Sequence, residues 1–145
     1  EGVYMAALIH DIGKIHVPSE MLSKPGRLSD LEYALIQTHP AVGAEALQTV
    51  PFPWPLQEMV RQHHERLDGS GYPRGLSGDE ILLEARILCV ADVVEAMQSH
   101  RPYRPALGQD VALEEVRRGS GKTFDGAVVE ACLGLFHEGF AFSER

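Results

Sequence analysis

The stretch ILLEARILCVADVVEAM, from Ile81 to Met97, decides the fold class, because its helical pattern is strong. Its apolar residues recur three and four positions apart, which places Ala85, Leu88 and Cys89 on one surface of a helix. Asp92 falls on this same surface. We therefore expect a central core helix that carries a carboxylate in need of a partner.

Other helical segments lie on both sides of this one. Gly13 is expected to end the first of them, Ser29 and Glu32 to form a capping box, and Pro40 to separate two helices near His39. The helices are expected at about residues 3–12, 29–39, 40–50, 56–64, 110–118 and 124–136. No segment alternates apolar and polar residues long enough to predict a strand. The predicted fold class is all-α.

The composition indicates one globular domain. The chain has 145 residues, of which 44% are hydrophobic and 23% are charged, close to ordinary usage. Its formal net charge of -8 argues against binding to long nucleic acid, so a phosphate-bearing ligand needs metal ions or a local basic cluster. No apolar run approaches the roughly 20 residues of a membrane span. Cys89 and Cys132 lack CxxC spacing and suit a structural role in a reducing cytoplasm.

Asp92 is the residue that most needs an explanation. A buried carboxylate without a partner loses several kcal/mol of solvation, so a cation or a polar partner is expected beside it. The sequence offers five candidates for that neighbourhood, namely His10, Asp11, His39, His63 and His64. Imidazole and carboxylate together suit iron, manganese, zinc or nickel better than calcium. Adjacent histidines on a helix point about 100° apart, which suits either ligands for two adjacent ions or one ligand and one residue that supports a ligand.

Several of these residues also have ordinary structural interpretations. Taken alone, His10 and Asp11 form a hydrogen-bonded or capping pair more often than a metal site. Lys14 can neutralise the carboxyl end of its helix. Arg101 and Arg104 can be solvated charges, although the proline-stiffened RPYRP loop could also clamp a phosphate.

Five short motifs in fixed order carry a resemblance to a known family. They are HDIGK at 10–14, the His-Pro pair at 39–40, HHERLDGSGYP at 63–73, VADVVEAM at 90–97 and RPYR at 101–104. Together they resemble the HD-GYP family of cyclic di-GMP phosphodiesterases. The resemblance implies a compact multi-helix HD-type domain over residues 1–145. It also implies a bi- or trinuclear centre, often of iron or manganese, that converts the bacterial messenger to linear pGpG or to GMP.

The resemblance assigns roles to individual residues. It implies that His10, Asp11, His39, His63, His64 and Asp92 are metal ligands. Asp11 would bridge two ions, and Lys14 would assist at the scissile phosphate. Arg101 and Arg104 would hold the phosphates of the ligand. Glu95 and Tyr72 are further expected substrate contacts, and in the family the exposed GYP loop is also associated with docking of diguanylate cyclase domains.

The chain departs from the family pattern in two places. Family members usually carry a further histidine on a helix before HDxGK. The first residues here already have a helical pattern, with no N-cap residue before it. We therefore expect an excerpt that lacks its first helix or helices, one incomplete metal position, and an upstream sensor or regulatory domain. Relatives also commonly have an aspartate where Glu95 stands and a Thr-Ser-Asp run at 98–100.

Two other functions compete with cyclic di-GMP hydrolysis. The domain could hydrolyse another cyclic dinucleotide or a nucleotide monoester. Alternatively, it could act without catalysis, as a cyclic di-GMP sensor or as a docking module for a diguanylate cyclase through the GYP loop. The dense set of candidate ligands favours an enzyme.

Overall fold

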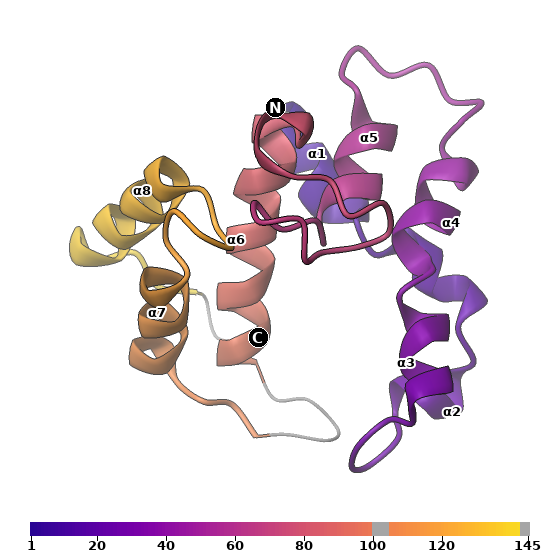
Figure 1. Ribbon diagram of the computed structural model, residues 1–145, viewed down its shortest axis with the longest axis horizontal. Helices are drawn as coiled ribbons and strands as arrows, with labels where there is room; N and C mark the ends of the chain where they lie inside the picture. Colours follow the sequence, from indigo (N-terminus) through magenta and orange to yellow (C-terminus); the bar gives the residue numbers. More distant parts are fainter. Residues whose placement is uncertain (100–104, 143–145) are drawn as a thin grey trace.

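The computed structural model describes residues 1–99 and 105–142, and these residues form helices and loops without a strand (Figure 1). The α-helices are α1 (Gly2–Ile9), α2 (Ser19–Leu22), α3 (Asp30–Ile36), α4 (His39–Ala46), α5 (Leu56–Gln62), α6 (Leu83–Gln98), α7 (Gln109–Arg118) and α8 (Gly126–His137). Two short 3-10 helices, η1 (Ile12–His16) and η2 (Gly78–Glu80), lie between them. The all-α prediction is confirmed.

Helix α6 lies at the centre of the molecule, as its apolar pattern predicts. It contacts α1 and α5 on one side and α7 and α8 on the other (Figure 1). Leu88 packs on the first side with Ala6, Leu56 and Met59. The second side has its own cluster, made of Cys89, Val90, Val94, Ala112, Val116, Phe124 and Val129. One helix therefore joins two separate apolar clusters.

The predicted end of the first helix is wrong. The α-helix ends at Ile9, and the chain then tightens into η1. Gly2 and Ala6 are buried, whereas Leu8 is 63% exposed and Ile12 is 42% exposed. The segment GVYMAALI is apolar on every side, so periodicity alone cannot single out the face that packs.

Gly13 is required for a close backbone contact rather than for a helix cap. It lies within η1, which packs against α4. A Cβ atom at this position would lie 2.0 Å from the carbonyl oxygen of His39. Only glycine permits this approach, which brings the segment after Asp11 against the start of α4.

The helices around Pro40 begin and end close to the predicted positions. Ser29 and Glu32 form the expected capping box at the start of α3. The break falls at Gln37 and Thr38, and His39 is already helical. The proposed cause is therefore wrong, because Pro40 lies in the first turn of α4, where its missing N–H costs no hydrogen bond.

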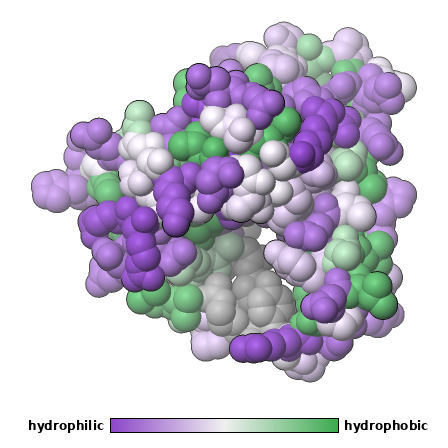
Figure 2. Space-filling view, in the orientation of Figure 1, coloured by the Kyte–Doolittle hydropathy of each residue, from purple (hydrophilic) through white to green (hydrophobic). Residues whose placement is uncertain are grey.

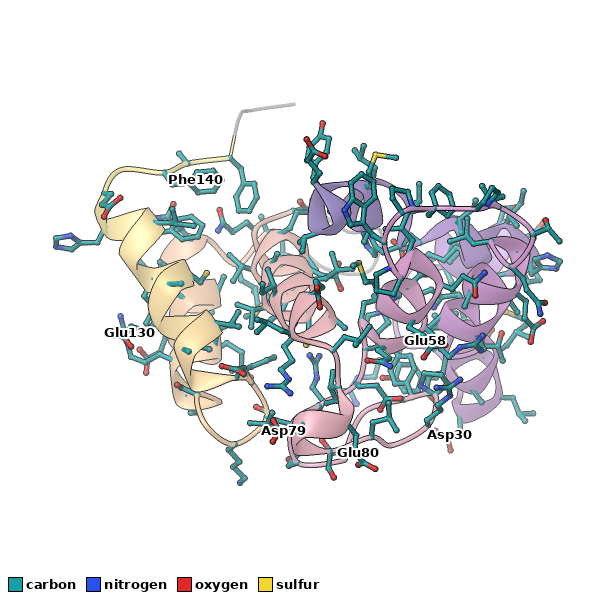
Figure 3. All side chains as sticks on the ribbon, turned by 90° about the horizontal axis from the view of Figure 1, so that it is seen from above. Asp30, Glu58, Asp79, Glu80, Glu130 and Phe140 are labelled. Carbon is teal, nitrogen blue, oxygen red and sulfur yellow. The ribbon has the colours of Figure 1, made fainter. Side chains whose placement is uncertain are left out.

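An apolar groove of about 470 Å³ runs between α6 and α8. Val90, Val94 and Val128 line it, together with Phe140 and Phe142 from the segment after α8. Figure 3 shows Phe140 beside α8.

The surface of the molecule is mixed in character. Figure 2 shows hydrophilic side chains spread over one face of the molecule, with apolar ones between them. Among the described residues, no helix is long and apolar enough to cross a membrane.

Candidate metal centre

The six predicted metal ligands converge from four parts of the chain. His10 and Asp11 occupy the turn between α1 and η1. His39 is the first residue of α4, and Asp92 lies in the middle of α6. His63 and His64 follow α5 directly instead of lying within it, because that helix ends at Gln62. The predicted angle between adjacent helical histidines therefore does not apply.

The distances between ligand atoms define two overlapping groups. Nε2 of His39 lies 3.3 Å from Nε2 of His63 and 3.3 Å from Oδ1 of Asp11. Nε2 of His10 lies 3.6 Å from Oδ2 of Asp11 and 3.5 Å from Oδ1 of Asp92. Ligand atoms lie within 4.8 Å of one another in two sets, His39 with His63 and His64, and His10 with Asp11 and His63. His63 belongs to both sets.

Backbone carbonyls determine which ring nitrogen each histidine turns inward. Nδ1 of His10 lies 2.8 Å from the Ala7 carbonyl oxygen, and Nδ1 of His39 lies 2.7 Å from that of Ile36. His63 makes the same contact with Val60, at 2.5 Å. A carbonyl oxygen only accepts hydrogen bonds, so each Nδ1 carries the proton. In the neutral rings Nε2 then presents a lone pair, as metal-binding histidines do.

These residues fit a divalent metal ion. When neutral, His39 and His63 aim Nε2 lone pairs at each other, an arrangement that a cation between them would stabilise. Oδ1 of Asp11 is buried and accepts no hydrogen bond, although His39 is near. Burial lowers the pKa of His63 to about 4, and burial together with the charge of His63 lowers the pKa of His64 further. Both rings are therefore neutral and available as ligands at pH 7.

The two carboxylates of the cluster, Asp11 and Asp92, are ionised. Burial raises the pKa of Asp11, but the contacts with His39 and Lys14 outweigh burial and hold that pKa well below its usual range. At Asp92 burial is likewise outweighed by His10, and the pKa is lowered. The pKa of His10 is raised, since Asp92 and Asp11 overcome the effect of burial. Two ionised carboxylates beside the neutral rings of His63 and His64 suit iron, manganese or zinc.

Comparison with known proteins identifies the domain. The family model described as HD domain matches residues 1–128. This chain belongs to the HD domain family. A cyclic di-GMP phosphodiesterase of Vibrio cholerae is 42% identical over 142 residues, covering 93% of this chain and 29% of the relative. A 3'3'-cGAMP-specific phosphodiesterase 1 of the same organism is 44% identical over 117 residues, covering 81% and 27%.

A solved structure supports the fold of this HD domain. Bd1817, described as an HDG"Y"P protein from Bdellovibrio bacteriovorus, matches with a TM-score of 0.74 and 20% identity. The match covers 94% of this chain and 43% of that one. The resemblance to HD-GYP proteins is confirmed, and the chain spans less than a third of the length of the two Vibrio relatives.

Lys14 of the HD domain lies beside the cluster. Its Nζ donates a hydrogen bond of 2.6 Å to Oδ2 of Asp11. This ammonium group therefore pairs with a candidate ligand instead of neutralising the end of α1. Glu95 lies one turn after Asp92 on α6 and accepts a hydrogen bond of 2.7 Å from the Ser99 hydroxyl. The predicted phosphate contacts Arg101 and Arg104 lie outside the described residues.

Tyr72 is less exposed than predicted. Its ring stacks on that of His64, with centroids 4.8 Å apart, and its N–H donates to the His64 carbonyl at 3.2 Å. The neighbouring Gly71 makes this fold of the loop possible, since a Cβ there would lie 2.4 Å from the same carbonyl oxygen. Tyr72 therefore forms part of the wall beside the candidate metal ligands.

Sequence reasoning gave no role to Glu65. Its side chain is 2% exposed, and its two oxygens accept hydrogen bonds from the N–H groups of Arg74 and Leu76, at 2.7 and 2.9 Å. This carboxylate thus holds the loop that carries Tyr72. The position of Glu65 directly after two histidines could have indicated a structural role. Its partners are backbone N–H groups, however, and these cannot be identified from the sequence.

Proposed function

We propose that this HD domain is a metal-dependent phosphodiesterase that hydrolyses cyclic di-GMP to linear pGpG, GMP or both in bacterial second-messenger signalling. The observation that carries the proposal is the convergence of four imidazoles and two carboxylates on one site, with Nε2 of His10, His39 and His63 facing other members of the cluster. The names of the relatives and the HD-GYP motifs support the choice of a cyclic dinucleotide as the substrate.

The proposed ligands are the six residues of the cluster, with Asp11 between two ions. His10, His39, His63 and His64 would supply nitrogen, and Asp11 and Asp92 would supply oxygen. Bound divalent ions would supply Lewis acidity and activate water for in-line attack on phosphorus. The imidazole and carboxylate set supports iron or manganese in this role, as a bi- or trinuclear centre.

The side chains around the cluster perform the remaining tasks. Lys14 places its ammonium group beside Asp11, where it can neutralise the negative charge that develops on a phosphoryl oxygen. No protein nucleophile is required, and the exposed Ser70 hydroxyl donates a hydrogen bond to Asp68, which is not part of the cluster. We also assign substrate contacts to Tyr72 and Glu95, and phosphate binding to Arg101 and Arg104.

A second substrate, 3'3'-cGAMP, is a specific alternative because one relative carries that activity in its name. It contains the same phosphodiester linkages, so the proposed chemistry at the metal centre is unchanged. The two candidates differ in one base only. A non-catalytic sensor or a docking module for a diguanylate cyclase is the remaining alternative. We place the longer protein, with an upstream regulatory domain, in the cytoplasm.

The test is hydrolysis by the full-length protein, expressed with iron or manganese available and analysed for metal content. We expect turnover of cyclic di-GMP, with loss of both metal and turnover after chelation and recovery after the metal is restored. His16→Ala is the matched control, since this histidine is exposed and lies outside the cluster. A protein that holds metal and binds cyclic di-GMP without cleaving it would support the sensor function instead.

A further inference from the structure

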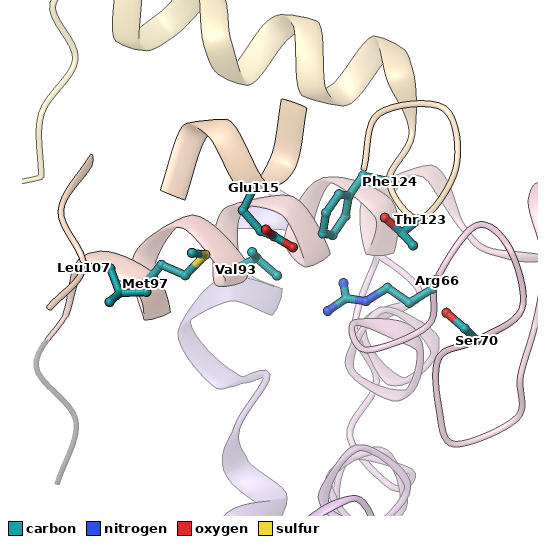
Figure 4. Close-up of a pocket in the computed structure, with 8 residues that line it drawn as sticks. All are labelled: Arg66, Ser70, Val93, Met97, Leu107, Glu115, Thr123 and Phe124. Carbon is teal, nitrogen blue, oxygen red and sulfur yellow. The ribbon is translucent and has the colours of Figure 1, made fainter. Parts of the chain in front are cut away.

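A cavity of about 450 Å³ is bounded by α6, α7 and the segment after α5 (Figure 4). Its volume falls within the range of roughly 300–1,000 Å³ that is usual for small-molecule sites. Two of its lining residues adjoin candidate ligands in sequence, Arg66 two residues after His64 and Val93 directly after Asp92. A ligand that reaches the metal centre with a phosphate could therefore place another group here.

Arg66 supplies the cavity with hydrogen-bond donors. Its Nη1 contacts the sulfur of the buried Cys89, and its guanidinium carbon lies 5.0 Å from the centre of the Phe124 ring. These two contacts hold the guanidinium in place. Within residues 1–99 and 105–142 no ion pair joins Arg66 to a carboxylate, although the protein is acidic. Arginine has five N–H donors, so most of them are available to a ligand.

Glu115 supplies an acceptor from α7. Figure 4 shows its carboxylate and the Arg66 guanidinium both turned toward the cavity, one from α7 and the other from the loop after α5. The Glu115 carboxylate is 3.9 Å from Arg118, a loose surface pair. Val93, Met97 and Leu107 add apolar walls between the two charged groups. The cavity thus combines a fixed donor fork, a carboxylate and apolar faces.

This combination fits a flat heterocycle with an acceptor edge and a donor edge. A simple anion would be repelled by Glu115, and an apolar ligand would leave Arg66 and Glu115 desolvated without partners. Guanine presents O6 and N7 as acceptors, the pair that arginine binds with two hydrogen bonds. Its N1–H and N2–H groups are donors, which suit a carboxylate. Adenine presents an amino group beside N7, so one donor would face another.

We propose that the cavity between α6 and α7 is a guanine subsite, in which Arg66 and Glu115 select guanine over adenine in one nucleotide of the substrate. The inference rests on the proposed function and deepens it. Arg66 and Glu115 are specificity-determining residues in this assignment, and they take no part in breaking the phosphodiester bond.

The test compares Glu115→Gln with Glu114→Gln in the metal-loaded full-length protein. Both glutamates are exposed on α7 and both changes remove one negative charge, but only Glu115 lines the cavity. We measure kcat/KM for the cyclic dinucleotides with two, one and no guanines. Glu115→Gln should reduce the preference for guanine by roughly 5- to 100-fold, the range expected for a lost two-bond base contact, whereas Glu114→Gln should leave it unchanged.

Arg66→Lys is the second variant, because lysine keeps the charge but cannot make the paired contact. It should also reduce the preference, with metal content and unfolding temperature measured to confirm an intact fold. Equal losses for all substrates, or an unchanged ratio in both Glu115→Gln and Arg66→Lys, would overturn the guanine subsite while leaving the phosphodiesterase intact.

Binding of GMP and AMP keeps the subsite testable if hydrolysis is absent. Calorimetry on the metal-loaded protein should show tighter binding of GMP than of AMP, and Glu115→Gln should remove the difference. Equal binding of GMP and AMP by the unmodified protein would refute the subsite. Tight GMP binding without any turnover would instead refute the proposed enzyme and retain the subsite.

Discussion

The side of α6 that faces α1 and α5 carries Asp92 and borders a cluster of histidines, whereas the side that faces α7 and α8 carries Val90 and Val94. The core of the second side is an apolar cluster packed between α6, α7 and α8. The first side is assembled where other helices begin or end, at His10, His39 and His63. The geometry of the histidine cluster therefore depends on where each helix begins or ends. The position of each single ligand atom determines whether the cluster can bind a metal ion.

The difference between the two sides predicts different responses to substitution. Ordinary packing tolerates changes that conserve volume, and damage to it is felt as lost stability. A cluster of ligands loses its chemistry when one atom is removed, even where the fold survives. Four experiments test that separation.

Asp11→Ala should have the largest effect, on the metal side. The proposed bridging carboxylate is shared by two ions, so its loss should reduce turnover by more than the roughly 10- to 100-fold that follows loss of a residue supporting a ligand. Turnover and metal content of the purified variant are measured beside those of His39→Ala. Higher residual activity in Asp11→Ala than in His39→Ala would contradict the bridging role.

Acid should destabilise the metal-free protein through the same side. The pKa of His63 is about 4 in the folded state, because the ring is buried, against 6.5 when exposed. Between these values the unfolded chain takes up a proton and the folded chain does not, so the free energy of unfolding falls as pH drops from 6.5 toward 4. The loss from His63 should approach about 3 kcal/mol, at roughly 1.4 kcal/mol per pH unit.

Urea unfolding at several pH values measures this effect. The lowered pKa of His64 adds to the loss, whereas the raised pKa of His10 works against it, since its contribution is present below pH 6.5 and is lost as pH rises through its folded pKa. His63→Leu should flatten the pH dependence and the exposed His16→Ala should not. An unchanged slope in His63→Leu would assign the effect to other groups.

Val94→Ala should weaken the apolar side and leave the metal side intact. Val94 is 1% exposed, so the change removes buried methyl groups and leaves a cavity that should cost about 2 kcal/mol. Chemical unfolding gives the cost, and metal stoichiometry should not change. Leu135→Ala, at a residue 54% exposed on α8, is the control with a small expected effect. Loss of metal in Val94→Ala would show that the two sides are coupled through α6.

Ser29→Ala should have the smallest effect, because Ser29 caps α3, a short helix well before α6 in the chain. It removes the side chain that caps α3 and should cost about 1 kcal/mol of stability, without a change in turnover. Thermal unfolding and a hydrolysis assay measure the two quantities. Ser23→Ala is the comparison, because the Ser23 hydroxyl donates to the carbonyl oxygen of Ser19 one turn earlier and caps no helix start. A loss of turnover in Ser29→Ala would show that α3 is coupled to the metal side of α6.

The amino-acid pattern determined the features that depend on residues near one another in the chain. Ala85, Leu88 and Cys89 are buried as predicted, because a helix repeats every 3.6 residues whatever surrounds it. The prediction of one shared surface is wrong, since Leu88 and Cys89 pack into separate clusters. The capping box at Ser29 likewise needs only two residues three positions apart. The six candidate ligands were also marked by residue type, since histidine and aspartate on apolar segments need partners.

Tertiary structure decided the features that depend on distant backbone. A single sequence does not tell which face of the uniformly apolar α1 is buried, because that depends on where Trp54 and α5 lie. It did not reveal that Gly13 touches the His39 carbonyl, or that Glu65 binds two backbone N–H groups of the next loop. The position of His63 between both ligand groups follows from the crossing of helices, and periodicity within one helix contains no information about another.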